Sequence, residues 1–390
     1  MIKRLILTVI FLASFATHLY AANNSLADWT LIIFMSSDND LSAAALDDVD
    51  EMSKIGSTER VNVIVLRDSL DSGTHTKVYH IQKGKPLVVK NFGANIDTGN
   101  WHELVDLFKL AQEQFPAQKY MVTVWNHGNG WEKNSKNKLQ KGIAYDDNSG
   151  NNITTKQLGD ALREISLLRG KKLELFSTDA CLMQMVEVAY EFKDYVDYFA
   201  ASEEVEPGQG WPYREILSAI TKKPEMGALE LGQTISRLYV DSYKNGTQEG
   251  DLATFSVVAL PELSAAVDTL PNLVEALSNL GSLRPRFFDN LKLAQSYDSP
   301  EYVDLLDFIS NVRPVLSKNL KANEALSKTE SAFAKAIKYE AHWGNDVKKS
   351  RGISIWLPKE KIPENYLEEY KTLQFEQKVN WTKLIDSYLL

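Results

Sequence analysis

The chain of 390 residues contains a single cysteine, Cys181. It therefore cannot form an internal disulfide, and one thiolate cannot build a cysteine-based structural zinc site. A lone thiol is either a small buried hydrophobe or a group available for chemistry. With 44% hydrophobic and 10% aromatic residues, a chain of this length can bury a large apolar core without covalent cross-links.

The sequence also lacks an excess of basic charge and any metal-binding spacing. Its formal net charge is -9, which argues against nucleic acid as a partner, because phosphate backbones are bound by clustered lysine and arginine. The histidines form no HxxxH pair. The run Asp146–Asn152 lacks the ligand alternation and the terminal glutamate of an EF-hand loop, and the segment Asp38–Asp40 is interpreted as a loop and helix cap. No metal site is therefore predicted.

One apolar stretch stands at the start of the chain, where Leu5–Ala16 follows two basic residues and precedes Ala21 and Ala22. This is the pattern of a secretory signal peptide, here predicted to occupy residues 1–21. The stretch is too short to favour a membrane span, so no stable membrane insertion is expected once it is removed. We expect an exported protein, either periplasmic or secreted.

The rest of the chain alternates strand-like and helix-like segments. Short apolar runs typical of strands buried on both faces lie at 29–35, 61–66, 120–125 and 173–177. Helical periodicities lie between them, and one begins with a capping box formed by Thr154 and Gln157. This alternation predicts an α/β fold with a mostly parallel sheet covered by helices on both sides. After about Pro212 the pattern is more helical, with further strand-like runs at 252–260 and 352–357.

Two of these runs end in side chains suited to catalysis, His127 and Cys181. The carboxyl ends of parallel strands meet at one edge of a sheet, where sites form, and a nearby imidazole lowers the pKa of a thiol. Apolar residues recur at helical spacing after the cysteine, which predicts that it lies in the first turn of a helix, with its own N–H free to bind an oxyanion. The N–H of Gly128 is a second candidate donor for this oxyanion hole.

Asp179 lies two residues before the cysteine. Alternate residues of a strand point the same way, so its carboxylate is expected roughly 7 Å from Cys181 on the same side. It could line a pocket for a lysine or arginine side chain, orient His127 as a third catalytic residue, or simply cap the following helix. Strand geometry favours the pocket over the triad. A separate segment, 132–141, is polar, aperiodic and lysine-rich, and is predicted to be an exposed, mobile loop.

Taken together, these motifs resemble the clostripain-like (C11) cysteine peptidases, which belong to the clan of caspases, legumains and gingipains. The resemblance is carried by the sequences WNHGNGW at 125–131 and DACLM at 179–183, and it extends from about residue 29 to 213 and more faintly beyond. It implies a caspase-like (hemoglobinase-like) α/β catalytic core over 22–213, with the C-terminal part, 214–390, packed on that core.

The resemblance also implies roles for individual residues. His127 and Cys181 match the family's catalytic dyad, and Asp179 matches the aspartate that lines the pocket for a basic P1 side chain. Members commonly cut themselves after a basic residue between the histidine and the cysteine, where this chain has Lys133, Lys136, Lys138 and Lys141.

The sequence thus predicts an exported endopeptidase that cleaves protein or peptide substrates after arginine or lysine. No cofactor is expected to be required. Some family members depend on calcium, but no motif in this chain supports that dependence. The alternative from another class is a non-catalytic surface or periplasmic binding protein that retains the peptidase fold.

Overall fold

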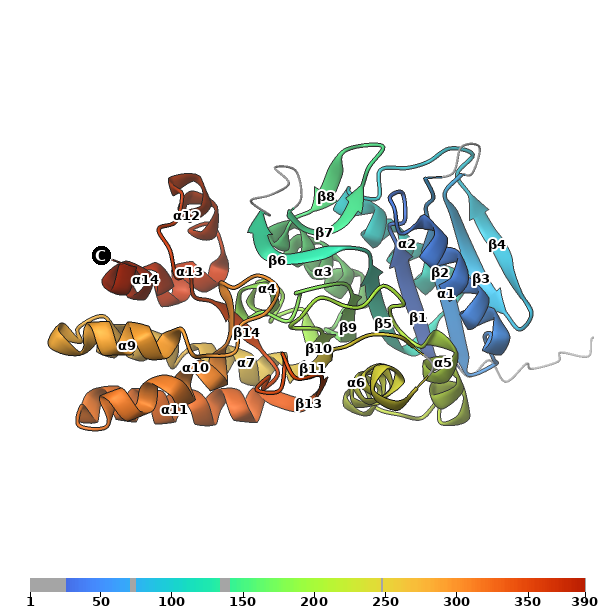
Figure 1. The fold of residues 1–390 in the computed structure, drawn as a ribbon. Helices are drawn as coiled ribbons and strands as arrows, with labels where there is room; N and C mark the ends of the chain where they lie inside the picture. The colour runs from blue at the N-terminus through green and yellow to red at the C-terminus, as the bar shows by residue number, and fades with distance from the viewer. Residues whose placement is uncertain (1–25, 71–74, 134–140, 247, 390) are drawn as a thin grey trace, which may run out of the picture.

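The computed structural model describes residues 26–70, 75–133, 141–246 and 248–389 (Figure 1). The predicted signal peptide, Lys136 and Lys138 lie outside the described residues. The strands described form one large sheet of nine strands and two small ones. In spatial order the large sheet contains β13 (Ile337–Trp343), β11 (Ala253–Ala259), β10 (Val196–Ala201), β9 (Leu173–Asp179), β5 (Ala117–Trp125), β1 (Ala27–Met35), β2 (Val61–Arg67), β3 (Lys77–Gln82) and β4 (Lys85–Asn91).

The centre of this sheet is parallel and its two margins are antiparallel. The strands β10, β9, β5, β1 and β2 run parallel to one another, whereas β3 and β4 on one side and β11 and β13 on the other pair antiparallel. The four strands predicted from short apolar runs are β1, β2, β5 and β9, and all four belong to the parallel centre. The predicted α/β fold with a mostly parallel sheet is therefore confirmed.

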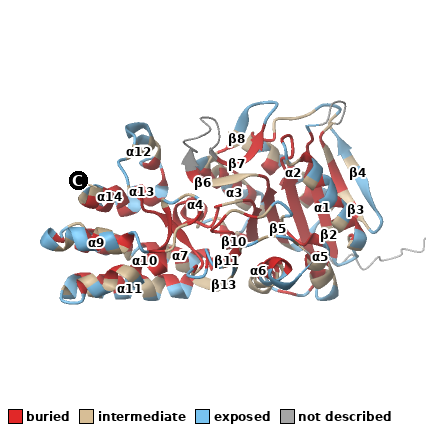
Figure 2. Ribbon diagram, viewed as in Figure 1, coloured by how far each residue is buried: buried red, intermediate tan, exposed pale blue. Residues whose placement is uncertain are grey.

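Helices cover both faces of the sheet, as the alternating side chains of β1 show. Ile32 and Phe34 belong to one apolar core and Leu31 and Ile33 to another. The first core contains residues of α2 (Trp101–Gln114), α3 (Thr155–Arg169) and α4 (Val186–Glu191), and the second contains residues of α1 (Ser42–Ile55), α5 (Tyr213–Lys222) and α6 (Ala228–Asn245). The buried strands run between these two layers (Figure 2). The capping box predicted at Thr154 is present at the start of α3.

The chain after residue 213 contributes both sheet and helices. Its strands β11 and β13 extend the large sheet beyond β10, so this sheet contains strands from both parts of the sequence. The remaining elements gather at one end of the molecule (Figure 1). They are α7 (Leu260–Val267), α8 (Leu270–Leu277), η1 (Gly281–Leu283), α9 (Arg284–Leu291), β12 (Tyr302–Asp304), α10 (Leu305–Val312), η2 (Arg313–Leu316), α11 (Leu320–Ala336), β14 (Ser354–Trp356), α12 (Glu364–Tyr370), α13 (Gln374–Val379) and α14 (Trp381–Leu389).

A small sheet lies beyond the end of β5 and consists of β6 (Gly128–Lys133), β7 (Lys141–Asp146) and β8 (Asn151–Ile153). Lys133 pairs with Lys141 in this sheet. Residues 132–141 were predicted to be a loop, but both ends of that segment belong to strands, because antiparallel pairing satisfies their backbone groups. The connection between the two strands is therefore shorter than 132–141. Among the described residues, no helix is long and apolar enough to cross a membrane.

Candidate active site

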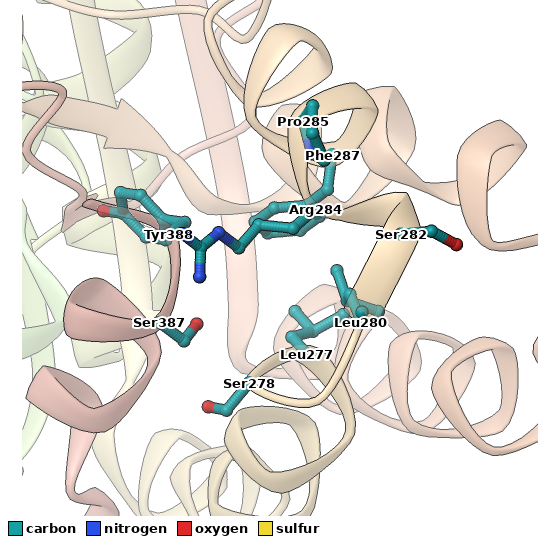
Figure 3. Close-up of a pocket in the computed structure, with 10 residues that line it drawn as sticks. Leu277, Ser278, Leu280, Ser282, Arg284, Pro285, Phe287, Ser387 and Tyr388 are labelled. Atoms are coloured by element: carbon teal, nitrogen blue, oxygen red, sulfur yellow. The ribbon is translucent and has the colours of Figure 1, made fainter. Parts of the chain in front are cut away.

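Two cavities differ in the chemistry of their walls. One, of about 270 Å³, lies among the C-terminal helices, where the Arg284 side chain and the Tyr388 ring are among its lining residues (Figure 3). No cysteine, histidine or carboxylate is found among the described residues that line it. The other, of about 500 Å³, is lined by both His127 and Cys181. The second cavity is therefore the candidate active site.

The parallel pairing of β5 with β9 brings these two side chains together. Trp125 and Asp179 are register partners at the ends of the two strands, so the residues that follow them emerge at the same edge. A Cβ atom added to Gly128 would lie 2.5 Å from the carbonyl oxygen of Cys181. Only glycine permits this close approach of the two backbones. Gly128 and Cys181, the two predicted oxyanion donors, are thus direct neighbours.

The segment after Cys181 differs from its prediction. The helix α4 begins at Val186, so the prediction that the cysteine lies in the first turn of a helix is wrong. The intervening backbone instead bonds to the chain that follows β10, since Leu182 N–H donates to Glu204 O at 3.2 Å and Gln184 N–H donates to Ser202 O at 2.9 Å. These tertiary bonds override the helical spacing of the apolar residues. Leu182 has a φ of 62°, a left-handed conformation that is uncommon for a residue other than glycine.

The imidazole of His127 is held by a residue that the sequence had suggested only as part of a loop. Its Nε2 lies 2.7 Å from Oδ1 of Asp40, and the two side chains are 37% and 80% exposed. Because a carboxylate oxygen can only accept a hydrogen bond, Nε2 carries a proton and donates a hydrogen bond to Asp40. In the neutral ring Nδ1 is then the free acceptor. Asp40 rather than Asp179 therefore fixes the tautomer of His127.

The thiol of Cys181 lies in a different environment. The N–H of Glu206 donates to its Sγ at 3.3 Å. Burial raises the pKa of the Cys181 thiol to about 12, and the carboxyls of Glu206, Glu204 and Asp179 act in the same direction when they are ionised. In this conformation the thiol is protonated at neutral pH. Cleavage therefore needs a base, or a rearrangement that removes the covering groups.

Asp179 is 5% exposed and lies close to the thiol but outside the lining of the cavity. Its Oδ2 accepts a hydrogen bond from the hydroxyl of Tyr213 at 2.7 Å. A Cβ atom added to Gly210 would lie 3.3 Å from its Oδ1, so the backbone closes tightly over this carboxylate. Burial raises the pKa of Asp179 to about 6.

Sequence reasoning missed a second carboxyl at this place, Glu206. It lies against Asp179, and burial together with the Asp179 charge raises its pKa well above the usual range. It faces the Asp179 carboxyl and the backbone N–H of Ala180, and neither of its oxygens makes a hydrogen bond of full geometry among the described residues. Two carboxyls buried together retain a proton. The available signal was an acidic residue beside Pro207 and Gly208 in a segment that otherwise resembles a turn.

The residues Glu204–Pro207, which we call the covering segment, separate this carboxyl pair from the cavity. Val205 lines the cavity, whereas Glu206 is buried behind it. The pair has no lysine or arginine partner among the described ion pairs. The site thus contains two buried acidic groups next to a nucleophile and no cation to balance them.

Comparison with known proteins places this geometry in a family. A model of the clostripain family matches residues 33–388. Clostripain of Hathewaya histolytica is 24% identical over 423 residues, which cover 90% of this chain and 78% of that protein.

Two solved structures are similar in fold. One is a secreted C11 cysteine protease of Bacteroides thetaiotaomicron in complex with an irreversible peptide inhibitor, with a TM-score of 0.71 and 21% identity over 91% of this chain and 99% of the other. The second is an inactive zymogen of a C11 protease from Parabacteroides distasonis, with a TM-score of 0.69 and 20% identity over 91% and 99% of the two chains.

A parallel sheet with a cysteine and a histidine at adjacent strand ends, in a chain matched along most of its length by these proteins, defines a cysteine-type peptidase. The chain belongs to the clostripain family. Its substrates are accordingly proteins or peptides, which favours the peptidase over the non-catalytic binding protein that the sequence had left open.

Proposed function

We propose that the protein is an exported endopeptidase that cleaves peptide bonds after arginine or lysine, with Cys181 as nucleophile and His127 as base. One observation carries the proposal: both side chains line one cavity, and the buried carboxyls of Asp179 and Glu206 lie directly behind the thiol without a basic partner among the described residues. A substrate side chain that brings a positive charge would supply that partner. An apolar side chain would leave two acidic groups uncompensated.

The chemistry follows from the tautomer of the imidazole. Nε2–H of His127 donates to Asp40, so Nδ1 accepts the proton of the Cys181 thiol as the sulfur attacks the substrate carbonyl carbon. The N–H groups of Gly128 and Cys181 would stabilise the negative oxygen that forms. Nδ1–H then protonates the leaving amine, the C–N bond breaks, and water hydrolyses the thioester to release the acid and restore the thiol.

Substrate binding requires a change of the covering segment. The Asp179 carboxylate is closed off by Glu206, Gly210 and Tyr213. A lysine or arginine side chain can reach it only if the Glu206 side chain moves aside. The described conformation is therefore proposed to be a resting state in which a protonated carboxyl pair occupies the pocket.

Peptides that differ only in the P1 residue test this specificity. Fluorogenic substrates with arginine, lysine, leucine or aspartate at P1 are incubated with the wild type and with Cys181→Ala. We expect cleavage after arginine and lysine only, and none by the variant. Comparable cleavage after leucine would refute the acidic pocket, and activity of Cys181→Ala would refute the nucleophile.

We further propose that the chain cuts itself after Lys133, Lys136, Lys138 or Lys141. The strands β6 and β7 lead to this segment, and β6 begins at Gly128, which contacts the backbone of Cys181. Peptide mass spectrometry of the wild type and Cys181→Ala, after incubation at neutral pH with a reductant, should show a cut in this segment in the wild type only. A variant with all four lysines replaced by alanine should stay as one chain.

Export is proposed from the signal-like sequence at residues 1–21, and one related protease of known structure is described as secreted. Sequencing of the mature N-terminus should give a chain that begins at Ala22. A retained Met1 in the cell-free medium or periplasm would contradict signal cleavage.

A further inference from the structure

One carboxylate in the wall of the active-site cavity has no part in the chemistry proposed above. Asp298 lines this cavity, and the residue is exposed. It belongs to the connection between α9 and β12, in the C-terminal part of the chain. Among the ion pairs of the described residues, none joins its carboxylate to a lysine or arginine. The charge of Asp298 is therefore available to a ligand that enters the cavity.

The two other aspartates of the described wall belong to the histidine side of the cavity. Asp40 accepts the hydrogen bond of His127, and the N–H of Asp147 donates to the backbone of the loop that carries Asp40. In the proposed mechanism His127 protonates the leaving amine, so the residues after the cleaved bond lie on this side. Asp298 is joined instead to the covering segment beside Cys181. The residues before the cleaved bond lie there, because the P1 pocket is behind that segment.

Two adjacent glutamates hold Asp298 in place. The hydroxyl of the buried Tyr297 donates to Oε1 of Glu203 at 2.7 Å. The N–H of Asp298 donates to Oε1 of Glu204 at 3.0 Å. A binding group whose backbone is fixed by such supporting bonds is organised before the substrate arrives. Neither bond involves Glu206, so Asp298 keeps its position when the Glu206 side chain moves aside.

The wall next to Asp298 is apolar. The aliphatic side chains among the described lining residues are Leu182 and Val205. Both are bonded to Glu204, since Leu182 N–H donates to its carbonyl at 3.2 Å and Val205 N–H donates to its Oε1 at 2.7 Å. Their common partner gathers Leu182, Val205 and Asp298 at one part of the wall. An arginine or lysine side chain has an aliphatic stem and a cationic end, which matches an apolar surface that ends in a carboxylate.

We propose that Asp298 binds a positively charged side chain at P2, the residue before P1, so that pairs of basic residues are the preferred cleavage sites. This inference rests on the proposed function, since it concerns the substrate of the same site. The cavity of about 500 Å³ is on the order of 10 Å across, and an extended peptide advances about 3.3 Å per residue, so it holds P1 and about one residue on each side. Successive side chains of an extended peptide point in opposite directions, so the P2 side chain does not compete for the Asp179 pocket.

Substrates that differ only at P2 test this assignment. The full chain is given acetyl-Ala-X-Arg-aminomethylcoumarin with arginine, alanine or glutamate at X. The coumarin leaving group has no side chain that could contact the histidine side. We expect kcat/KM to be about fivefold higher with arginine than with alanine at P2, mainly through KM, and lowest with glutamate, because an exposed ion pair contributes only modestly. The difference should shrink at about 1 M sodium chloride, which screens exposed charges.

Matched variants assign the preference to one residue. Asp298→Asn keeps the shape of the side chain and should cut the peptides with arginine and alanine at P2 at similar rates. Asp298→Arg should reverse the order, so that glutamate at P2 is cut best. Asp289→Asn, at an exposed aspartate of α9 outside the cavity wall, should keep the preference of the wild type.

The outcomes separate this inference from the function on which it rests. Cleavage after arginine at P1 with no dependence on P2, or a P2 preference that persists in Asp298→Asn, would overturn the role of Asp298 and leave the proposed function intact. Failure of the wild type to cleave any of the three peptides would overturn both.

Discussion

The two halves of the candidate active site are built in opposite ways. The histidine half is open: the His127 ring and its partner Asp40 are both substantially exposed, and their hydrogen bond already sets the tautomer that a general base needs. The cysteine half is less open: Cys181 is partly buried where it lines the cavity, burial and neighbouring carboxyls hold its thiol in the protonated form, and Glu206 covers Asp179. The base is thus organised in advance, whereas the nucleophile and the specificity pocket await a change in the covering segment.

The largest expected effect comes from removal of the base. His127→Ala should reduce kcat/KM for an arginine substrate by about 10³-fold, within the range for loss of general acid–base catalysis. Its far-UV circular dichroism should match the wild type, because the ring is partly exposed. A loss below tenfold would show that the open half is not the catalytic one, and that the thiol is activated by another group.

The second largest effect is expected from loss of the acidic pocket. Asp179→Asn should lower kcat/KM for arginine and lysine substrates by about 10²-fold, since a buried charge pair that loses one partner costs several kcal/mol. Cys181 should still react with a small alkylating agent. Loss of alkylation together with cleavage would instead assign Asp179 to activation of the dyad, the alternative that is disfavoured because His127 bonds to Asp40 and Asp179 bonds to Tyr213.

We expect a smaller effect, about tenfold, of pH on the rate of Cys181 alkylation, through the state of the covering segment. Burial raises the pKa of both Asp179 and Glu206, so the closed state binds more protons than an open state with ordinary carboxyl pKa values near 4. The closed state is therefore favoured at low pH and loses this advantage as pH rises through about 6. As the pH rises through about 6, the rate of Cys181 alkylation should increase by more than the titration of the thiol alone explains.

The double variant Asp179→Asn, Glu206→Gln is the matched control for this experiment. It keeps both side chains nearly the same size but removes both titrating groups. The pH dependence of its alkylation rate should reflect only the titration of the Cys181 thiol. If the wild type and the double variant share one pH profile, the carboxyl pair does not control access to Cys181.

Local patterns in the sequence predicted the parts of this site that depend on local structure. The strands β5 and β9 place His127 and Cys181 at one edge because apolar runs of this kind form parallel strands, and the Thr154 capping box is a contact within a few residues. The helix predicted at Cys181 failed because Leu182 and Gln184 bond to residues after β10, which no periodicity reveals.

Residues whose roles come from tertiary contacts were also missed. Glu206 acquires its role only because the chain returns from β10 to Asp179. Asp40 was interpreted as part of a loop because its contact with His127 joins distant parts of the chain. Pattern analysis thus located the reacting groups and overlooked the groups that surround them.

The smallest effect is expected at the open half, in the contact between Asp40 and His127. The carboxylate of Asp40 is 80% exposed, and an exposed ion pair contributes only about 0–1 kcal/mol. Asp40→Ala should therefore lower kcat about threefold to fivefold, because the tautomer of His127 is less strictly held. KM should be unchanged, because the pocket is intact. Asp40→Asn, whose amide oxygen still accepts from Nε2–H, should restore most of the loss. Equal defects in the two variants would show that the negative charge of Asp40, rather than the orientation of the ring, supports the base.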